Sequence, residues 1–277
     1  MKTGGCVLWG ADYTERNWKE RMTLNAKKYY PLMSELVRRD VKLKYRRSVL
    51  GYLWSLLNPL MMMAIMTLVF SHVFRYESIK NYPLYLICGQ TLFAFFNEST
   101  SMAMYSIIRN GPLIKKVYIP KFIFPISKVF SCFVTMAFSL VAILIVMIFT
   151  RAPFHWSMLL FWAPVLLLLI FCCGMGMIVS ALSVQFRDVT HLYSVLTTAW
   201  MYLTPIFYPI EVVPDWVARI IACNPLYMYI TLFRSLVLDG VVPGAGLWLA
   251  ALGVSALMIA LGSFVFGKMQ RDFILYI

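Results

Sequence analysis

Charged residues are scarce in this sequence, and acidic residues are the scarcest of them. Of its 277 residues, 13% are charged and 61% are hydrophobic. An ordinary soluble domain has about 25% charged and about 45–50% apolar residues. A water-soluble fold of this size could not bury so much apolar surface. Each membrane-spanning helix uses roughly 20 apolar residues, so there is room for about six spans and their connections. The composition therefore predicts an all-α, polytopic membrane protein.

The acidic residues do not form the pairs that catalysis in a membrane needs. Of the 12 Asp and Glu residues, only Glu98 falls inside a predicted span, and no two meet at helical spacing within the bilayer. Membrane enzymes that act on lipid phosphates or sugars generally use paired carboxylates or a metal cluster. The DxD, HExxH and GxSxG motifs are absent. We therefore expect no catalytic residue, and the enzyme class is disfavoured.

Metal and nucleotide sites also lack their sequence signals. The six cysteines include no CxxC, and the three histidines are scattered, whereas zinc requires spaced ligands. Gly5 to Gly10 mimics the glycine spacing of a phosphate-binding loop, but Ala11-Asp12 follows instead of lysine and Ser/Thr. We expect no metal and no cofactor in this chain, so that any ATP and Mg²⁺ would be bound by a partner subunit.

Six apolar segments are predicted to span the membrane. Asn58-Pro59 interrupts the first and should kink it, since proline removes one backbone hydrogen bond. The chain then divides into an N-terminal segment, 1–47, and a six-span domain, 48–277. The predicted spans are Leu50 to Phe74, Tyr82 to Ile108, Phe122 to Thr150, Trp156 to Leu182, Tyr193 to Tyr208 and Gly246 to Phe266.

The second half of the N-terminal segment, Tyr30 to Arg47, has the pattern of an amphipathic helix. Met33, Leu36, Val37 and Val41 recur at helical spacing, and basic residues fill most of the remainder. A helix with one apolar face and one basic face lies in the membrane interface. The alternative is a plain juxtamembrane anchor.

The connection between the fifth and sixth spans, Pro209 to Gly240, is long for a loop and strongly apolar. Asp215 can cap one short helix, and Asn224-Pro225 can start a second that ends at Gly240. Two short apolar helices predict a re-entrant outer hairpin, which is tolerated at depth only when it packs on protein or lines a cavity. A seventh span is the alternative, and Arg234 argues against it.

Basic residues are distributed unevenly along the chain, whose net charge is +13. Most of the 25 Lys and Arg residues fall in the N-terminal segment, the second-to-third connection and the C-terminal tail. Positively charged loops stay in the cytoplasm, so both termini are predicted to be cytosolic. This distribution also accounts for the charge without any nucleic-acid partner.

Glu98 and several aromatic residues are the candidates for contacts within the spans. An ionisable group in a span is a functional candidate by default. Glu98 could contact a polar substrate, pair with a basic residue such as Lys128, or be structural. Sugar rings bind well on aromatic faces, although packing against lipid or helices is the alternative. The aromatic candidates are Phe93, Phe95, Phe96, Trp200, Tyr202 and Tyr208.

Three stretches of the chain resemble ABC-2-type export permeases. Arg38 to Leu60 resembles the entry to their first span, and Asn110 to Lys121 resembles their second-to-third cytoplasmic loop. Thr204 to Pro214, followed by Asn224 to Leu226, resembles their outer hairpin. The stretches occur in order and with matching spacing. The branch that they resemble exports polysaccharides and polyol phosphates, such as O-antigen, capsule and wall teichoic acid.

This resemblance implies a transport permease of the cytoplasmic (inner) membrane. It implies a homodimer of six-span subunits joined to two ATPase subunits, with a polymer on an undecaprenyl-diphosphate carrier as cargo. The expected function is ATP-driven export of a lipid-linked polysaccharide or teichoic-acid-like polymer. Export of another cargo, or a membrane enzyme or channel that acts on lipid-linked sugars, stays open as the alternative.

The resemblance also implies two sets of site residues. The helix before the first span and the second-to-third loop would dock on the ATPase, with the fourth-to-fifth loop as a lesser contact. The docking set is Glu35, Arg38, Arg39, Lys42, Leu113, Lys115, Lys116, Val117, Tyr118, Arg187 and Asp188. Basic residues of the same helix sit where the carrier's diphosphate could bind, because the arginine fork matches phosphate oxygens. Positive-inside anchoring is the alternative for them. With the candidates inside the spans, the substrate and carrier set is Arg38, Lys42, Arg46, Arg47, Glu98, Phe93, Phe96, Trp200 and Tyr202.

Overall fold

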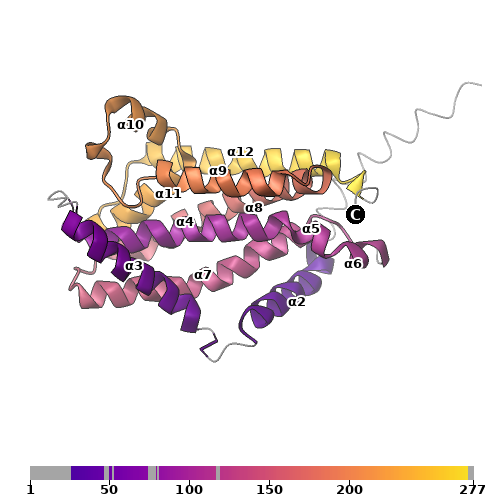
Figure 1. Ribbon diagram of the computed structural model, residues 1–277, viewed down its shortest axis with the longest axis horizontal. Coiled ribbons are helices and arrows are strands. Elements are labelled where there is room, and N and C mark those ends of the chain that lie inside the picture. The colour runs from indigo at the N-terminus through magenta and orange to yellow at the C-terminus, as the bar shows by residue number, and fades with distance from the viewer. Residues whose placement is uncertain are drawn as a thin grey trace, which may run out of the picture.

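The computed structural model describes residues 26–46, 50–51, 53–73, 79, 81–116 and 119–273. Within these ranges the fold is all-helical, as the composition predicts, and no strand occurs. Most of the long helices run roughly along one axis, others cross it at a slant, and short helices lie at the two ends (Figure 1).

Each of the six predicted spans corresponds to a helix in the structure. Each consists of an apolar run bounded by polar or turn residues, so its hydrophobic length sets its limits. The six helices are α3 (Leu53–Val73), α4 (Tyr82–Met104), α7 (Ile123–Phe149), α8 (Trp162–Gln185), α9 (Val189–Leu203) and α12 (Ala245–Met269).

Length and composition qualify four of these helices as membrane spans, namely α3, α7, α8 and α12. A bent helix pair in the outer connection raises the number to five if it counts as one span. The helix α9 has 15 residues and is therefore about 22 Å long at 1.5 Å per residue, shorter than the roughly 30 Å hydrocarbon core. The helix α4 carries Gln90, Asn97 and Glu98. The described residues thus give a multi-pass protein with four candidate spans, or five if the bent pair counts as one.

The core lies among α4, α7, α8 and α12, and its closest contact joins α8 to α12. A Cβ atom at Gly174 would collide with the backbone of Met258, and one at Gly262 would collide with the backbone of Gly174. Small residues at these positions let the two backbones touch. By contrast, no residue of the apolar α3 window is buried, so α3 lies at the edge of the bundle.

The connection between α9 and α12, which is predicted to be the outer hairpin, folds as a helical pair. The helix α10 (Asp215–Ala222) meets α11 (Pro225–Arg234) and its π-helical continuation η3 (Ser235–Asp239) at an angle of 88°. The Asn224 side chain accepts a hydrogen bond from the Leu226 amide at 3.0 Å, and Gly240 ends the pair with a φ of 67°. That left-handed conformation suits glycine, which lacks a Cβ. The expected Asp215 cap is wrong, because Pro214 precedes the helix and Asp215 is its first residue without a side-chain cap bond.

The predicted amphipathic helix corresponds to α2 (Ala26–Tyr45). Leu36 is buried in a cluster with the start of α7 and the end of α12, which includes Phe124 and Phe266. Arg38 and Lys42 are exposed. Residues 1–25 lie outside the described part of the chain.

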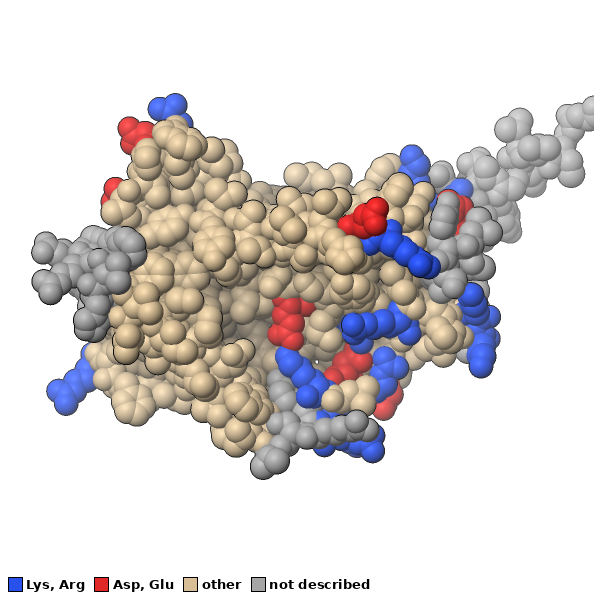
Figure 2. All heavy atoms as spheres, viewed as in Figure 1, with Lys and Arg blue, Asp and Glu red and all other residues tan. Residues whose placement is uncertain are grey.

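Lys and Arg gather at one end of the molecule, over α2, α5 (Ser106–Arg109) and α6 (Gly111–Lys116) (Figure 2). The opposite end, which carries α10 and α11, shows few of them in the same view. The molecule therefore has one basic end and one end formed by the helical pair.

Candidate functional site

The predicted docking residues come together at the basic end. Leu113 of α6 packs against the cluster that contains Leu36 of α2, whereas Lys115 and Lys116 point outward and are exposed. Glu35 and Arg39 are also exposed on α2, as are Arg187 and Asp188 in the turn between α8 and α9. Val117, Tyr118 and Arg47 lie outside the described residues. The fold thus presents a charged surface held by an apolar base.

Lys121 stabilises this end by joining α7 to the end of α12. Its Nζ donates a hydrogen bond to the Gln270 carbonyl at 2.6 Å and lies 5.5 Å from the centroid of the Phe273 ring. Partial burial lowers the pKa of Lys121, and the nearby Asp272 carboxylate opposes that shift.

Two ion pairs tie α2 to the long helices. The Lys128 ammonium lies 2.7 Å from the Asp40 carboxylate, and these side chains are 12% and 5% exposed. One turn further along α2, Lys44 pairs with Glu98 of α4, with side chains 37% and 40% exposed. Glu98 therefore pairs with Lys44, and the alternative pairing with Lys128 does not form because Asp40 occupies that lysine.

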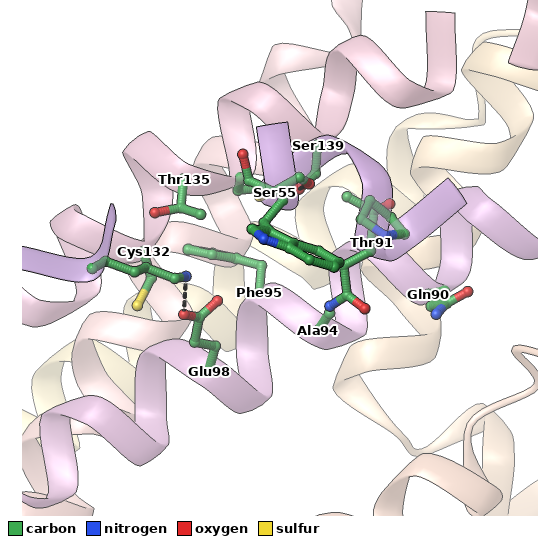
Figure 3. Close-up of a pocket in the computed structure, with 14 residues that line it drawn as sticks. Ser55, Gln90, Thr91, Ala94, Phe95, Glu98, Cys132, Thr135 and Ser139 are labelled. Carbon is green, nitrogen blue, oxygen red and sulfur yellow. Dashed lines mark hydrogen bonds and ion pairs between the residues drawn. The ribbon is translucent and has the colours of Figure 1, made fainter. Parts of the chain in front are cut away.

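A pocket of about 260 Å³ opens between α3, α4 and α7 beside the Lys44–Glu98 pair. Figure 3 shows polar side chains converging on it from all three helices. Trp54 and Phe95 provide aromatic walls. The polar and charged lining residues are Lys44, Ser55, Asn58, Gln90, Thr91, Glu98, Thr135 and Ser139.

A second, larger groove of about 780 Å³ runs between α2 and α7. Arg38 and Lys42 lie along it, and its walls are otherwise mainly apolar. The apolar lining residues are Met33, Val37, Val41, Phe130 and Val134. Two cations beside an apolar groove suit an amphiphile with an anionic head. Arg46 is exposed but does not line this groove.

The predicted aromatic residues take different positions. Phe93 and Phe96 are buried, and the centroids of the Phe96 and Trp200 rings lie 5.2 Å apart. The Trp200 indole donates to Asn224 Oδ1 at 2.8 Å and so links α9 to the outer helical pair. Tyr202 is 63% exposed on α9. Of the four aromatic residues in the substrate set, only Tyr202 thus has a broadly exposed ring.

Arg234 is a structural centre that the sequence reasoning did not identify. Its guanidinium is buried and donates hydrogen bonds to the carbonyls of Tyr85, Pro205 and Ile206 at 2.7–3.2 Å. The same group lies 3.4 Å from the centroid of the Tyr85 ring. This arginine therefore joins α11, α4 and the segment after α9. The available signal was a cation in an otherwise apolar short helix.

Metal ligands do not gather anywhere in the part of the chain that the structure describes. No group of three or more His, Cys, Asp or Glu residues there is placed to hold a metal ion.

Comparison with known proteins places these features in a family. The profile described as ABC-2 type transporter matches residues 31–238. The chain is 30% identical to an O-antigen export system permease protein of Myxococcus xanthus, over 91% of this chain and 98% of that protein. It is 32% identical to an O-antigen export system permease protein of Klebsiella pneumoniae, over 80% and 85%. A polysialic acid transport protein of Escherichia coli is 25% identical over 73% and 79%.

Proposed function

Because the chain belongs to the ABC-2 type transporter family, we propose that it is the membrane-spanning subunit of an ATP-driven polysaccharide exporter. The main support for this proposal is the similarity to an O-antigen export permease, which extends over 91% of this chain and 98% of that protein. Several apolar helices agree with a multi-pass protein of the inner membrane. The protein acts as a transport permease, with ATP hydrolysis assigned to a partner subunit.

We propose that the chain has six spans. Four are the helices that qualify by length and composition, and α4 and α9 are the other two. Gln90 and Glu98 of α4 line the pocket, which supports a span inside a bundle. The pair α10 and α11 forms a re-entrant hairpin on the outer side. The basic end lies in the cytosol with both termini, in accordance with the positive-inside rule. Two copies of the chain form the transport path.

The basic end is proposed to dock on the ATPase. Lys115 and Lys116 are exposed, as are Arg187 and Asp188, while Leu113 fixes the loop to the bundle. An apolar base that holds exposed charged side chains is suited to a protein interface, in which polar residues at the rim fix the orientation of the partner.

Charge reversal of Lys115 and Lys116 to glutamate is expected to reduce co-purification of the ATPase by about tenfold or more, because like charges across an interface cost several kcal/mol. Both side chains are exposed, so the permease should keep its melting temperature. Lys268→Glu, an exposed change near the end of α12, is the matched control. Unchanged co-purification of the double variant would contradict this docking surface.

The groove between α2 and α7 is proposed to receive the lipid carrier. Arg38 and Lys42 would meet the diphosphate, while the apolar walls receive part of the undecaprenyl chain. An interfacial position of α2 supports this assignment, since a carrier enters from the lipid rather than from water.

Deletion of the gene, followed by complementation, tests the exporter function. Without the permease, a surface polysaccharide should disappear and its lipid-linked form should accumulate inside the cell. A mild-detergent pull-down of the tagged chain should yield a stoichiometric ABC ATPase. Unaltered surface polymer, together with a well-folded permease that retains no ATPase, would refute the proposal.

A further inference from the structure

The Thr91 hydroxyl in the pocket between α3, α4 and α7 lacks the bond that helical threonines commonly make. Thr100, Thr135 and Thr197 each donate to the carbonyl four residues earlier, at 2.8–3.2 Å. Thr91 is 3% exposed and its Oγ1 has no hydrogen-bond partner. A buried hydroxyl normally finds a partner, so this one is available to a ligand.

A second unsatisfied atom lies beside it. The Oε1 atom of Gln90 is buried and also has no partner, and Gln90 lines the same pocket. Two of the five unsatisfied buried polar atoms in the described residues therefore come from adjacent residues at one pocket. Thr91 offers a donor and an acceptor, and Gln90 offers an acceptor. A ligand that satisfies both atoms should carry hydroxyl groups, because a hydroxyl both donates and accepts hydrogen bonds.

The shape and charge of the pocket narrow the ligand further. Its volume of about 260 Å³ lies just below the roughly 300–1,000 Å³ of small-molecule sites, which suits a single ring. Trp54 offers an aromatic surface beside the polar atoms. The charged residues among the described ones that line it are Lys44 and Glu98, which neutralise each other. A phosphate or carboxylate would find no excess positive charge here.

We infer that this pocket is a subsite for one uncharged, hydroxyl-bearing saccharide unit of the exported polymer. The inference rests on the proposed export function. Thr91 and Gln90 bind ring hydroxyls, Trp54 covers a ring face, and the Lys44–Glu98 pair bounds the pocket at the α2 side. The inference also specifies the cargo, because such a pocket favours a polymer with uncharged repeat units over a polyanion such as a teichoic acid.

Thr91→Val tests the subsite because it removes the hydroxyl and keeps the side-chain shape. Thr100→Val is the control on the same helix, since that hydroxyl is bonded to its own backbone. Export is measured as the initial rate at which labelled polymer reaches the surface, at equal permease levels. When polymer is limiting, Thr91→Val should lower the rate about 3–10-fold, the effect of one or two hydrogen bonds. Thr100→Val should stay within about twofold of the parent protein on the same basis.

Occupancy is measured separately with Thr91→Cys in a background carrying Cys6→Ser, Cys132→Ala and Cys223→Ser. An uncharged methanethiosulfonate reagent is applied to cells that make the polymer and to cells in which its first assembly step is blocked. Labelling should be several-fold slower when polymer is present. Equal labelling rates, or equal export by Thr91→Val and Thr100→Val, would overturn the subsite.

The outcomes separate this inference from the export function. If deletion of the permease leaves surface polymer unchanged, the exporter proposal itself fails. If deletion abolishes export but both threonine variants behave alike, only the subsite fails. Analysis of the polymer that accumulates in the deletion strain decides its charge. A repeat unit in which every sugar carries phosphate or carboxylate would overturn the assignment to an uncharged unit.

Discussion

Arg234→Ala is expected to destabilise the permease by about 3–5 kcal/mol. The guanidinium donates hydrogen bonds to the carbonyls of Tyr85, Pro205 and Ile206. The Tyr85 hydroxyl still reaches the Pro205 carbonyl at 3.3 Å, and the Tyr85 carbonyl lies within the α4 helix. The Ile206 carbonyl would lose its charged donor at a cost of about 1–3 kcal/mol, and the truncated side chain would also leave a cavity. The outer helical pair would lose its main polar attachment to α4.

The melting temperature of the purified protein measures this effect. A loss of that size corresponds to a decrease of roughly 6–20 °C for a chain of this length, if it unfolds cooperatively. Arg219→Ala on the exposed face of α10 is the matched control and should change the melting temperature little. An equal, small decrease for both variants would show that Arg234 is not the attachment point.

Gly89→Ala provides an independent test of the same arrangement. A Cβ atom at Gly89 would collide with the Arg234 guanidinium and would force it away from its carbonyl partners. The variant should therefore lower the melting temperature in a background with Arg234 intact. In an Arg234→Ala background it should add almost nothing, because residues that act through one contact are not additive.

The positions of the helices could be predicted from local sequence. Apolar runs placed all six long helices, because length and hydropathy are properties of each segment. Asn224-Pro225 and Gly240 placed the limits of the second outer helix, since a polar cap, an imino ring and a left-handed glycine act locally. Asp215 failed as a cap because it lies one residue inside its helix.

The contacts between distant residues could not be predicted in this way. Glu98 was identified as a candidate, but its partner Lys44 is 54 positions away, and Lys128 is held by Asp40, 88 positions away. Either lysine satisfies the same charge rule, so only the packing of α2 distinguishes them. Thr91 was missed for a related reason, because an unbonded hydroxyl cannot be told from a bonded one by residue type.

The buried ion pair between Asp40 and Lys128 gives the second large expected effect. Asp40→Asn leaves the Lys128 ammonium buried without its counter-charge, so the free energy of unfolding should fall by about 3–5 kcal/mol. The half-exposed Lys44–Glu98 pair should contribute at most about 1 kcal/mol, because water screens it. Glu98→Gln is therefore the matched control for stability, measured again by the melting temperature.

The double variant Asp40→Asn with Lys128→Met separates the cost of an unpaired charge from the value of the pair. Removing both charges should recover most of the lost stability, because a neutral, well-packed replacement of a buried pair is often neutral. Transport activity is not expected to recover together with stability, because this pair fixes α2 to α7, and α2 is part of the proposed ATPase contact. In reconstituted transporter, the double variant should hydrolyse ATP normally while exporting less polymer per ATP. Full recovery of that ratio would mean that the pair only stabilises the fold, and continued instability would mean that Asp40 acts through other contacts.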